Sequence, residues 1–177
     1  ATPLSGPWLS RHLWEHYEYT GDKEFLKNKA YPILEGASRF LLDYMIDDGT
    51  GRLVTAPSAS PENAFMLNGE RTYLTYSSTM DVEIILDVFD KTVAAAKLLG
   101  KENDGIIKEI NEAIPKLPKL KVSEKHGNLC EWIEDYEETE LGHRHVSHLY
   151  GLYPADVITR KDMTIYNAAR KAIDRRL

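Results

Sequence analysis

The sequence predicts a mainly α-helical fold in which neighbouring helices form pairs joined by short connections. Apolar residues recur at the three- and four-residue spacing that places them on one helix face, in several long stretches of the chain. Segments rich in proline, glycine, serine and aspartate separate these stretches and leave room only for short strands. Helix pairs of this kind suit a toroid or a bundle, although the sequence contains no convincing internal repeat.

The amino-terminal part predicts a helical hairpin. A first helix is expected to begin at Ser5 and to end at residues 20–22, Thr-Gly-Asp, because glycine favours helix ends. Asp22 is expected to cap a short second segment. A long apolar stripe with Pro32 in its first turn then extends over residues 31–45. The two long helices would lie against each other through these stripes.

A polar loop is expected at residues 55–63, Thr-Ala-Pro-Ser-Ala-Ser-Pro-Glu-Asn, after a short strand at 53–54. Pro61 moves Ser60 out of the helical region, so no helix continues through this loop. On local grounds two interpretations of Glu62 are open. It is a carboxylate at the start of the next turn, or it is an acid or base held on an ordered loop.

The remaining expected elements follow from turn residues, helix caps and apolar stripes. In order, they are a turn at 47–51, a hairpin at 65–76 around Asn68-Gly69, a helix capped by Ser78 or Thr79 that ends at Gly100, a helix at 102–114, short strands at 120–122 and 129–133 around a turn at 126–128, and a last helix capped by Asp162 or Thr164. An acidic run at 134–140 is typical of a solvated loop.

Composition excludes several classes of partner. The net charge is −6, with 22 basic against 28 acidic residues, so no basic stripe is present for nucleic acid or for an anionic membrane surface. Aromatic residues make up 10% of the chain and include ten Tyr and three Trp, which suits a carbohydrate-like ligand. One cysteine, Cys130, excludes an intrachain disulfide. A neutral or small polar partner therefore fits best.

Three histidines and an arginine gather at residues 142–154 and have three interpretations. Metal binding by His143, His145 and His148 would need an irregular backbone, and no His-Glu-x-x-His pattern is present. A structural role would have these side chains bond backbone carbonyls. In the third interpretation, Arg144 and the imidazoles bind the hydroxyl groups of a sugar while Glu62 transfers a proton. The candidates for a matching base are Glu131, Glu134 and Asp156.

Several sequence blocks together resemble one known family, the glycoside hydrolase family 95 α-L-fucosidases. The resemblance covers nearly the whole chain in the same order. The blocks are Trp-Leu-x-x-His-Leu-Trp-Glu-His-Tyr at 8–17 with Thr-Gly-Asp at 20–22, Pro-Ser-x-Ser-Pro-Glu-Asn at 57–63, Ser-Thr-Met-Asp at 78–81, Glu-Trp at 131–132, and Gly-His-Arg-His-Val-Ser-His-Leu at 142–149.

The resemblance implies both a fold and an activity. Members of the family fold as an (α/α)6 barrel and cleave terminal α-L-fucose, typically 1,2-linked, with inversion of configuration, so residues 1–177 are expected to form one segment of a larger catalytic domain. No metal or organic cofactor is implied. The expected partners are a fucosylated oligosaccharide or glycan and the rest of the parent catalytic domain, with no nucleic acid and no membrane. The parent enzyme is expected to be secreted or periplasmic.

The resemblance also implies roles for individual residues. Glu62 carries over as the general acid. Arg144 and His145 carry over as fucose contacts, and the remaining residues expected to line the sugar pocket are Trp8, Asn63, His143 and His148.

The chain departs from the family pattern in one respect that concerns activity. In the family, asparagines from a preceding segment and an aspartate from a following segment activate the water, and neither segment is found in these 177 residues. The chain is therefore expected to be an internal fragment that hydrolyses little by itself. The alternative is a non-catalytic helical carbohydrate-binding or interaction module.

Overall fold

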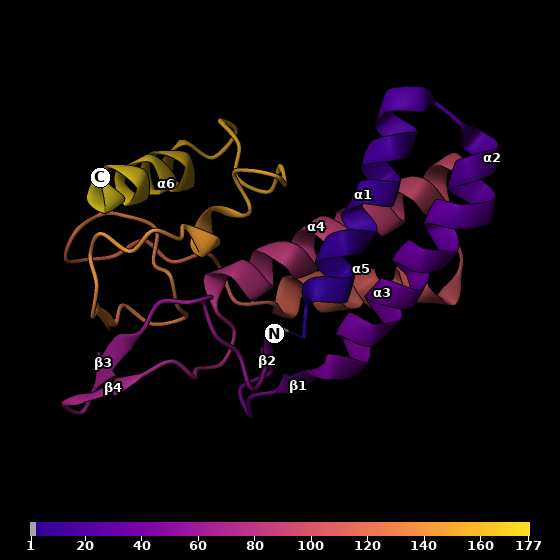
Figure 1. Cartoon of the computed structure of the whole chain (residues 1–177). Helices are drawn as coiled ribbons and strands as arrows, with labels where there is room; N and C mark the ends of the chain where they lie inside the picture. Colours follow the sequence, from indigo (N-terminus) through magenta and orange to yellow (C-terminus); the bar gives the residue numbers. More distant parts are fainter. Residues whose placement is uncertain (1–2) are drawn as a thin grey trace. The chain divides into compact units, whose positions relative to one another are not determined.

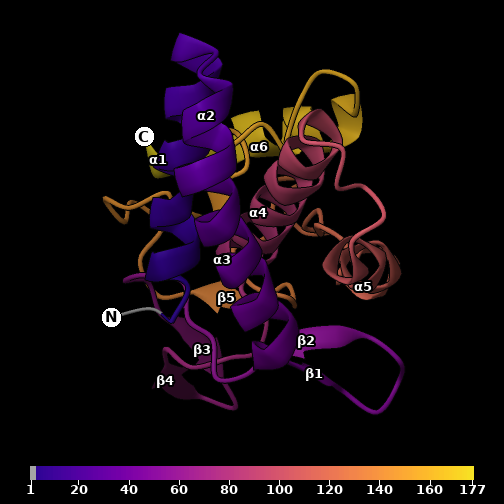
Figure 2. The same ribbon diagram turned by 90° about the vertical axis from the view of Figure 1, so that its right-hand side faces the viewer.

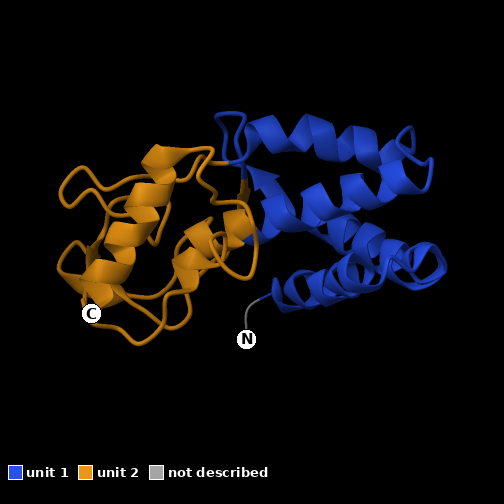
Figure 3. Ribbon diagram, turned by 90° about the horizontal axis from the view of Figure 1, so that it is seen from above, with its two compact units in different colours: residues 1, 3–53, 84–117 blue, residues 2, 54–83, 118–177 orange. Residues whose placement is uncertain are grey.

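A computed structural model describes residues 3–177, and about half of its residues are helical, which confirms the mainly α prediction. None of the described helices is both long and apolar enough to cross a membrane. The chain divides into two compact units, which Figure 3 distinguishes by colour. Among the described residues, unit 1 contains 3–53 and 84–117, and unit 2 contains 54–83 and 118–177.

Unit 1 is built from helices. Helix α1 packs along α3, and α3 also packs along α5 (Figures 1 and 2). A π-helical turn at Leu26–Ala30 joins α2 to α3, and a 3₁₀ turn at Ile114–Lys116 follows α5. The helices of this unit are α1 (Ser5–Thr20), α2 (Lys23–Phe25), α3 (Tyr31–Tyr44), α5 (Gly105–Ala113) and the larger part of α4 (Thr79–Leu98).

The predicted helix ends of the amino-terminal hairpin are confirmed. Gly21 adopts a left-handed conformation with φ +65°, and its N–H donates to the carbonyl of Tyr17. The Asp22 carboxylate accepts the N–H of Phe25 at 2.9 Å and caps α2 as expected. The helix predicted at 102–114 is shorter than expected, because Asp104 with an extended backbone is its N-cap and α5 begins at Gly105.

The interior of unit 1 contains a matched pair of buried hydroxyl groups. The Ser38 and Thr92 hydroxyls lie 2.8 Å apart, and both residues are fully buried. Thr92 also donates to the carbonyl of Val88 on its own helix. Because each polar atom has a partner, the apolar faces of α3 and α4 enclose these groups without leaving an unsatisfied donor.

Unit 2 contains a small antiparallel sheet in the order β4-β3-β5. The predicted hairpin is confirmed, because Phe65 pairs with Thr72, and Asn68 and Gly69 both have the positive φ angles of a tight hairpin turn. Phe65 also pairs with Glu138 on the other side. The strands are β3 (Phe65–Leu67), β4 (Glu70–Thr72) and β5 (Glu137–Glu138), while β1 (Met45–Asp47) and β2 (Leu53–Thr55) flank the predicted turn earlier in the chain.

The strands predicted at 120–122 and 129–133 are confirmed only in part, because their pairing is limited to a single bridge. One bridge, between Val122 and Leu129, joins the two segments. Two hydrogen bonds of 2.8 Å flank this bridge, from the N–H of Ser123 to the carbonyl of Asn128 and from the N–H of Cys130 to the carbonyl of Lys121. The N–H of Leu129 itself donates to the carbonyl of Ala168 on α6 (Met163–Arg176) at 2.9 Å. Asp162 caps α6 by accepting the N–H groups of Thr164 and Ile165, as one of the two predicted caps.

The carboxyl-terminal part of unit 2 has its own apolar core. The face of α6 that carries alanines packs there against the segments that precede the helix. The buried members of this core are Leu129, Leu149, Ile158, Ala168, Ala169 and Ala172. This core fixes the segment that carries the histidines, because Leu149 belongs to the 3₁₀ turn at Ser147–Leu149.

Candidate functional site

The first half of the loop at 55–63 is fixed by a buried aspartate. Asp81, in the first turn of α4 and 2% exposed, accepts hydrogen bonds from the hydroxyls of Thr55 (2.8 Å) and Ser58 (2.7 Å). Ser58 also exchanges two backbone hydrogen bonds with Thr75. Burial raises the pKa of Asp81, and the hydroxyl donors oppose that shift. The loop is therefore ordered, as the two prolines predicted.

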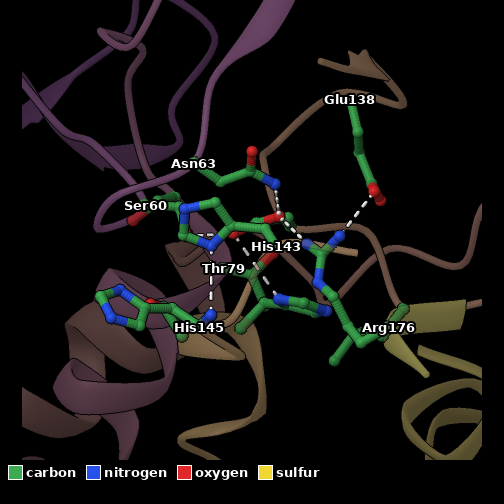
Figure 4. Close-up of polar contacts among 12 residues, drawn as sticks. Ser60, Asn63, Thr79, Glu138, His143, His145 and Arg176 are labelled. Carbon is green, nitrogen blue, oxygen red and sulfur yellow. Dashed lines mark hydrogen bonds and ion pairs between the residues drawn. The ribbon is translucent and has the colours of Figure 1, made fainter. Parts of the chain in front are cut away.

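The second half of the loop is fixed by a buried glutamate, Glu131. Its carboxylate accepts the hydroxyl of Ser60 at 2.8 Å and the side-chain amide of Asn63 at 2.9 Å. Arg176 of α6 donates to the same carboxylate at 2.5 Å and to Glu138 at 2.7 Å. The side chains of Asn63 and Arg176 converge in this network (Figure 4). Burial raises the pKa of Glu131, and the Arg176 guanidinium opposes the shift.

Glu62 projects from the anchored loop to the surface. Its side chain is 64% exposed, although Asn63 beside it is only 1% exposed. A guanidinium nitrogen of Arg144 lies 2.8 Å from Glu62 Oε2, and Nδ1 of His145 lies 3.9 Å from the same oxygen. The structure therefore brings Glu62 next to two neighbouring residues of the histidine segment, Arg144 and His145, which follow it by more than eighty positions.

The histidine segment separates into exposed and buried side chains. Arg144 and His145 are accessible, whereas His143 and His148 are 6% and 2% exposed. His143 Nδ1 accepts the N–H of His145 at 3.1 Å, and the two rings meet edge to face (Figure 4). His148 lies with its Nδ1 3.8 Å from Glu131. Direct sugar contacts by the buried residues Asn63, His143 and His148 stay predictions.

The remaining candidates are Trp8 and the three carboxylates considered as a base. Trp8 is on α1 in unit 1, where it is 36% exposed. Of the candidate bases, Glu131 is enclosed and Glu134 pairs with Lys121 at 2.6 Å, while Asp156 is exposed on the segment before α6. In the part of the chain that the structure describes, no group of His, Cys, Asp and Glu is arranged to hold a metal ion.

Glu131 also contributes to the lining of a hollow of about 430 Å³ within unit 2. Five carboxylates and the thiol of Cys130 contribute to its lining. Burial, together with the nearby Asp135, raises the pKa of this thiol to about 12. Such a thiol is a poor nucleophile near neutrality. The full lining is Lys125, His126, Asn128, Cys130, Glu131, Trp132, Glu134, Asp135, Tyr136, Glu137, Glu138, Leu141 and Arg175.

An exposed carboxylate on a fixed loop, next to a guanidinium and an imidazole, is suited to proton transfer to a polar ligand, as a glycoside hydrolase requires. Residues 1–177 match the family described as the glycosyl hydrolase family 95 catalytic domain. The chain therefore belongs to glycosyl hydrolase family 95.

Similar curated proteins carry consistent names. Alpha-L-fucosidase 2 of Arabidopsis thaliana is 51% identical over 158 residues, which are 89% of this chain and 19% of that protein. Probable alpha-fucosidase A of Aspergillus niger is 30% identical over 161 residues, or 89% of this chain and 20% of that protein. The same-named protein of Aspergillus oryzae is 31% identical over 109 residues, or 59% of this chain and 14% of that protein. The chain spans about a fifth of the length of the first two relatives.

Three anchoring residues were not assigned by sequence reasoning. The sequence assigns no role to Asp81 or Arg176, and it indicates Glu131 only as a candidate base. A signal for the anchors was present, because the loop spaces three small hydroxyl residues among prolines, and buried hydroxyls need acceptors. Which carboxylates supply those acceptors depends on contacts between residues 23 to 71 positions apart, such as Ser58 with Asp81 and Ser60 with Glu131.

His148 provides a prediction about pH. Burial, aided by the Arg176 charge, lowers its pKa from 6.5 to about 3, so the folded state keeps it neutral. The resulting stability is fully present above pH 6.5 and is lost progressively as the pH falls toward 3. Between pH 7 and pH 5 we expect the wild-type chain to lose about 2 kcal/mol of unfolding free energy that a His148→Asn variant does not lose.

Urea titrations of both proteins at the two pH values measure this difference. The buried carboxylates are shared by the two proteins, so their effects largely cancel. His126→Asn, at an exposed histidine, is the matched control and should behave as the wild type. Parallel losses in the wild type and the His148 variant would show that His148 is protonated in the folded chain.

Proposed function

We propose that this chain is part of the catalytic domain of an inverting α-L-fucosidase with an (α/α)6 barrel, and that Glu62 is its general acid. The substrate is a glycan or oligosaccharide with terminal, 1,2-linked α-L-fucose. The complete enzyme is the longer polypeptide, similar in length to the relatives, that contains this chain. Residues outside the chain supply the water-activating group in this proposal, and no metal or organic cofactor takes part.

One observation carries the proposal: Glu62 is exposed on a loop in which the nearby Ser60 and Asn63 are buried and hydrogen-bonded. A proton donor needs access to the glycosidic oxygen and a fixed position relative to it. Membership of glycosyl hydrolase family 95 and the names of the relatives support the assignment of α-L-fucose. An inverting reaction places the acid and the water-activating group roughly 6.5–9.5 Å apart, which leaves room for one water molecule.

The ion pair between Arg144 and Glu62 has a consequence for the catalytic cycle. In that pair Glu62 is a carboxylate, whereas the acid role requires a protonated carboxyl group. The pair must therefore open in the productive complex. Sugar hydroxyl groups are good acceptors for a guanidinium, so the substrate offers Arg144 a new partner and leaves Glu62 free to hold a proton. Arg144 and His145 then contact the fucose directly.

Replacing Arg144 should weaken substrate binding and turnover together. We expect Arg144→Met in the complete enzyme to lower kcat/KM about 10- to 100-fold, since hydrogen bonds from a charged group contribute about 1.5–3 kcal/mol. Steady-state kinetics on a 1,2-fucosylated oligosaccharide measure the effect. Arg71→Met, at an exposed arginine on β4, is the matched control. An unchanged kcat/KM for Arg144→Met would remove this residue from the sugar site.

A single comparison separates the enzyme from the alternative of a binding module. The complete enzyme should release fucose from a 1,2-fucosylated oligosaccharide, and this chain alone should release little. A complete protein that binds the glycan without releasing fucose would instead support the non-catalytic module. Turnover by the isolated chain close to that of the complete enzyme would contradict the claim that residues elsewhere activate the water.

A further inference from the structure

The carboxylate of Glu131 holds residues on both sides of Glu62. One oxygen accepts the Ser60 hydroxyl at 2.8 Å, and the other accepts the Asn63 amide at 2.9 Å. We propose that Glu131 is a positioning residue for Glu62: it fixes the backbone from which the acid projects and so sets the direction of proton delivery. This inference rests on the proposed role of Glu62 as general acid.

The remaining neighbours of Glu62 are anchored as well. The Ser147 hydroxyl donates to the carbonyl of Pro61, and Thr139 donates to the carbonyl of Ala64 through its N–H (3.0 Å) and its hydroxyl (3.1 Å). Glu62 itself contacts only the exposed side chains of Arg144 and His145 in the hydrogen bonds and ion pairs of the described residues. The backbone is therefore held on both sides while the acid remains free to meet a ligand.

Glu131 is suited to positioning and unsuited to the role of catalytic base. Its side chain is 1% exposed, and its oxygens already accept hydrogen bonds from Ser60, Asn63 and Arg176. With its oxygens held by these donors, Glu131 is poorly placed to activate a water molecule. In an enclosed site, a charged acceptor with several donors has a well-defined orientation, because each bond is stronger there than in water.

Arg176 fixes Glu131 from the side of α6. It donates to Glu131 at 2.5 Å, to the Glu138 carboxylate at 2.7 Å and to the carbonyl of Leu141 at 2.8 Å. Figure 4 shows Arg176 bonded to Glu138 and directed toward the region of Ser60 and Asn63. Through Glu131, the loop is thus held by a residue at the end of a fourteen-residue helix and not by a surface side chain.

Loosening the contact between Glu131 and the loop is predicted to slow only the step in which Glu62 transfers its proton. A displacement of about 1 Å at a catalytic group can lower the rate about 100-fold. Glu131 does not reach the sugar, so loosening its hold on the loop should lower kcat and leave KM nearly unchanged. The loss should also depend on the leaving group. A sugar alcohol needs a proton to depart, whereas dinitrophenolate departs as a stable anion and needs no general acid.

Ser60→Ala in the complete enzyme is the first test, because it removes one loop anchor and keeps the pair of Glu131 and Arg176 intact. We expect kcat on a 1,2-fucosylated oligosaccharide to fall about tenfold or more and kcat on dinitrophenyl α-L-fucoside to change little. Ser38→Ala is the matched control, since Ser38 is also a buried serine with one hydroxyl partner, in unit 1. It should leave both rates unchanged at a similar melting temperature.

Removal of the amide donor of Asn63 is the second test. Asn63→Asp removes the amide donor, keeps an acceptor for the N–H of Ala64, and places a second carboxylate against Glu131. We expect the same selective loss of kcat.

The outcomes separate this inference from the function on which it rests. If Glu62→Gln shows the leaving-group selectivity but Ser60→Ala and Asn63→Asp keep wild-type rates, or lose equally on both substrates, Glu131 does not act through the acid. If Glu62→Gln itself shows no selectivity, the assignment of the acid fails instead.

Discussion

Glu62→Gln in the complete enzyme is expected to lower kcat on a 1,2-fucosylated oligosaccharide by about 10²–10⁴, the usual contribution of a general acid. Glutamine has nearly the same size as glutamate and carries no transferable acidic proton. The side chain is 64% exposed, so the substitution leaves no buried group unsatisfied and the fold should be intact. Steady-state kinetics together with a thermal unfolding curve test both parts of this expectation.

The matched control for this variant is Glu70→Gln, which makes the same chemical change at an exposed glutamate on β4. It should retain the wild-type rate. Dinitrophenyl α-L-fucoside serves as the second substrate, because its cleavage needs no proton and should be slowed far less by Glu62→Gln. A variant at Glu62 with a wild-type rate on the oligosaccharide would remove this residue from the acid role.

Phe65→Ala is expected to have the largest effect on stability. Phe65 is 1% exposed, stacks on Tyr136 with ring centroids 4.2 Å apart, and meets Trp132 at 4.9 Å. It also begins β3, directly after the loop that carries Glu62. Removing the ring leaves a cavity among these aromatic residues, so the free energy of unfolding should fall by about 3–5 kcal/mol.

Urea unfolding of the isolated chain, followed by tryptophan fluorescence, measures this loss. Phe40→Ala is the matched control, since Phe40 on α3 is 41% exposed and stacks only on Tyr44 among the rings of the described residues. Its cost should be below about 1 kcal/mol, as at most surface positions. Equal costs for the two variants would mean that the Phe65 cluster does not form in solution.

Local sequence signals were sufficient to predict most helices. Gly21 predicts the end of α1 and Asp22 the beginning of α2, and the structure confirms both. The Asn68-Gly69 pair likewise predicts its hairpin. These signals are reliable because they act within a few residues. The strands expected near Val122 and Leu129 are reduced to a single bridge. Leu129 bonds to α6, about 40 residues later, and apolar alternation alone does not distinguish a strand from an extended segment packed on a helix.

The exposed residues of the candidate site could be predicted from the sequence, but the buried residues that hold the loop in place could not. The sequence blocks indicated Glu62, Arg144 and His145, and the structure places these three together at the surface. Sequence could not show that Asn63 and His148 are enclosed, because burial depends on packing between distant segments. For the same reason it could not show that Asp81 and Glu131 hold the loop, although both carboxylates lie within the matched blocks.

The most direct test of the central claim is a crystal structure of the complete Glu62→Gln enzyme with an uncleaved 1,2-fucosylated oligosaccharide. We predict that the amide replacing the carboxyl group lies within about 3.2 Å of the glycosidic oxygen, in hydrogen-bond reach, and that Arg144 contacts fucose hydroxyls. A glycan bound with its glycosidic oxygen beyond the reach of this side chain, for example in the hollow beside Glu131, would contradict the claim that Glu62 is the general acid.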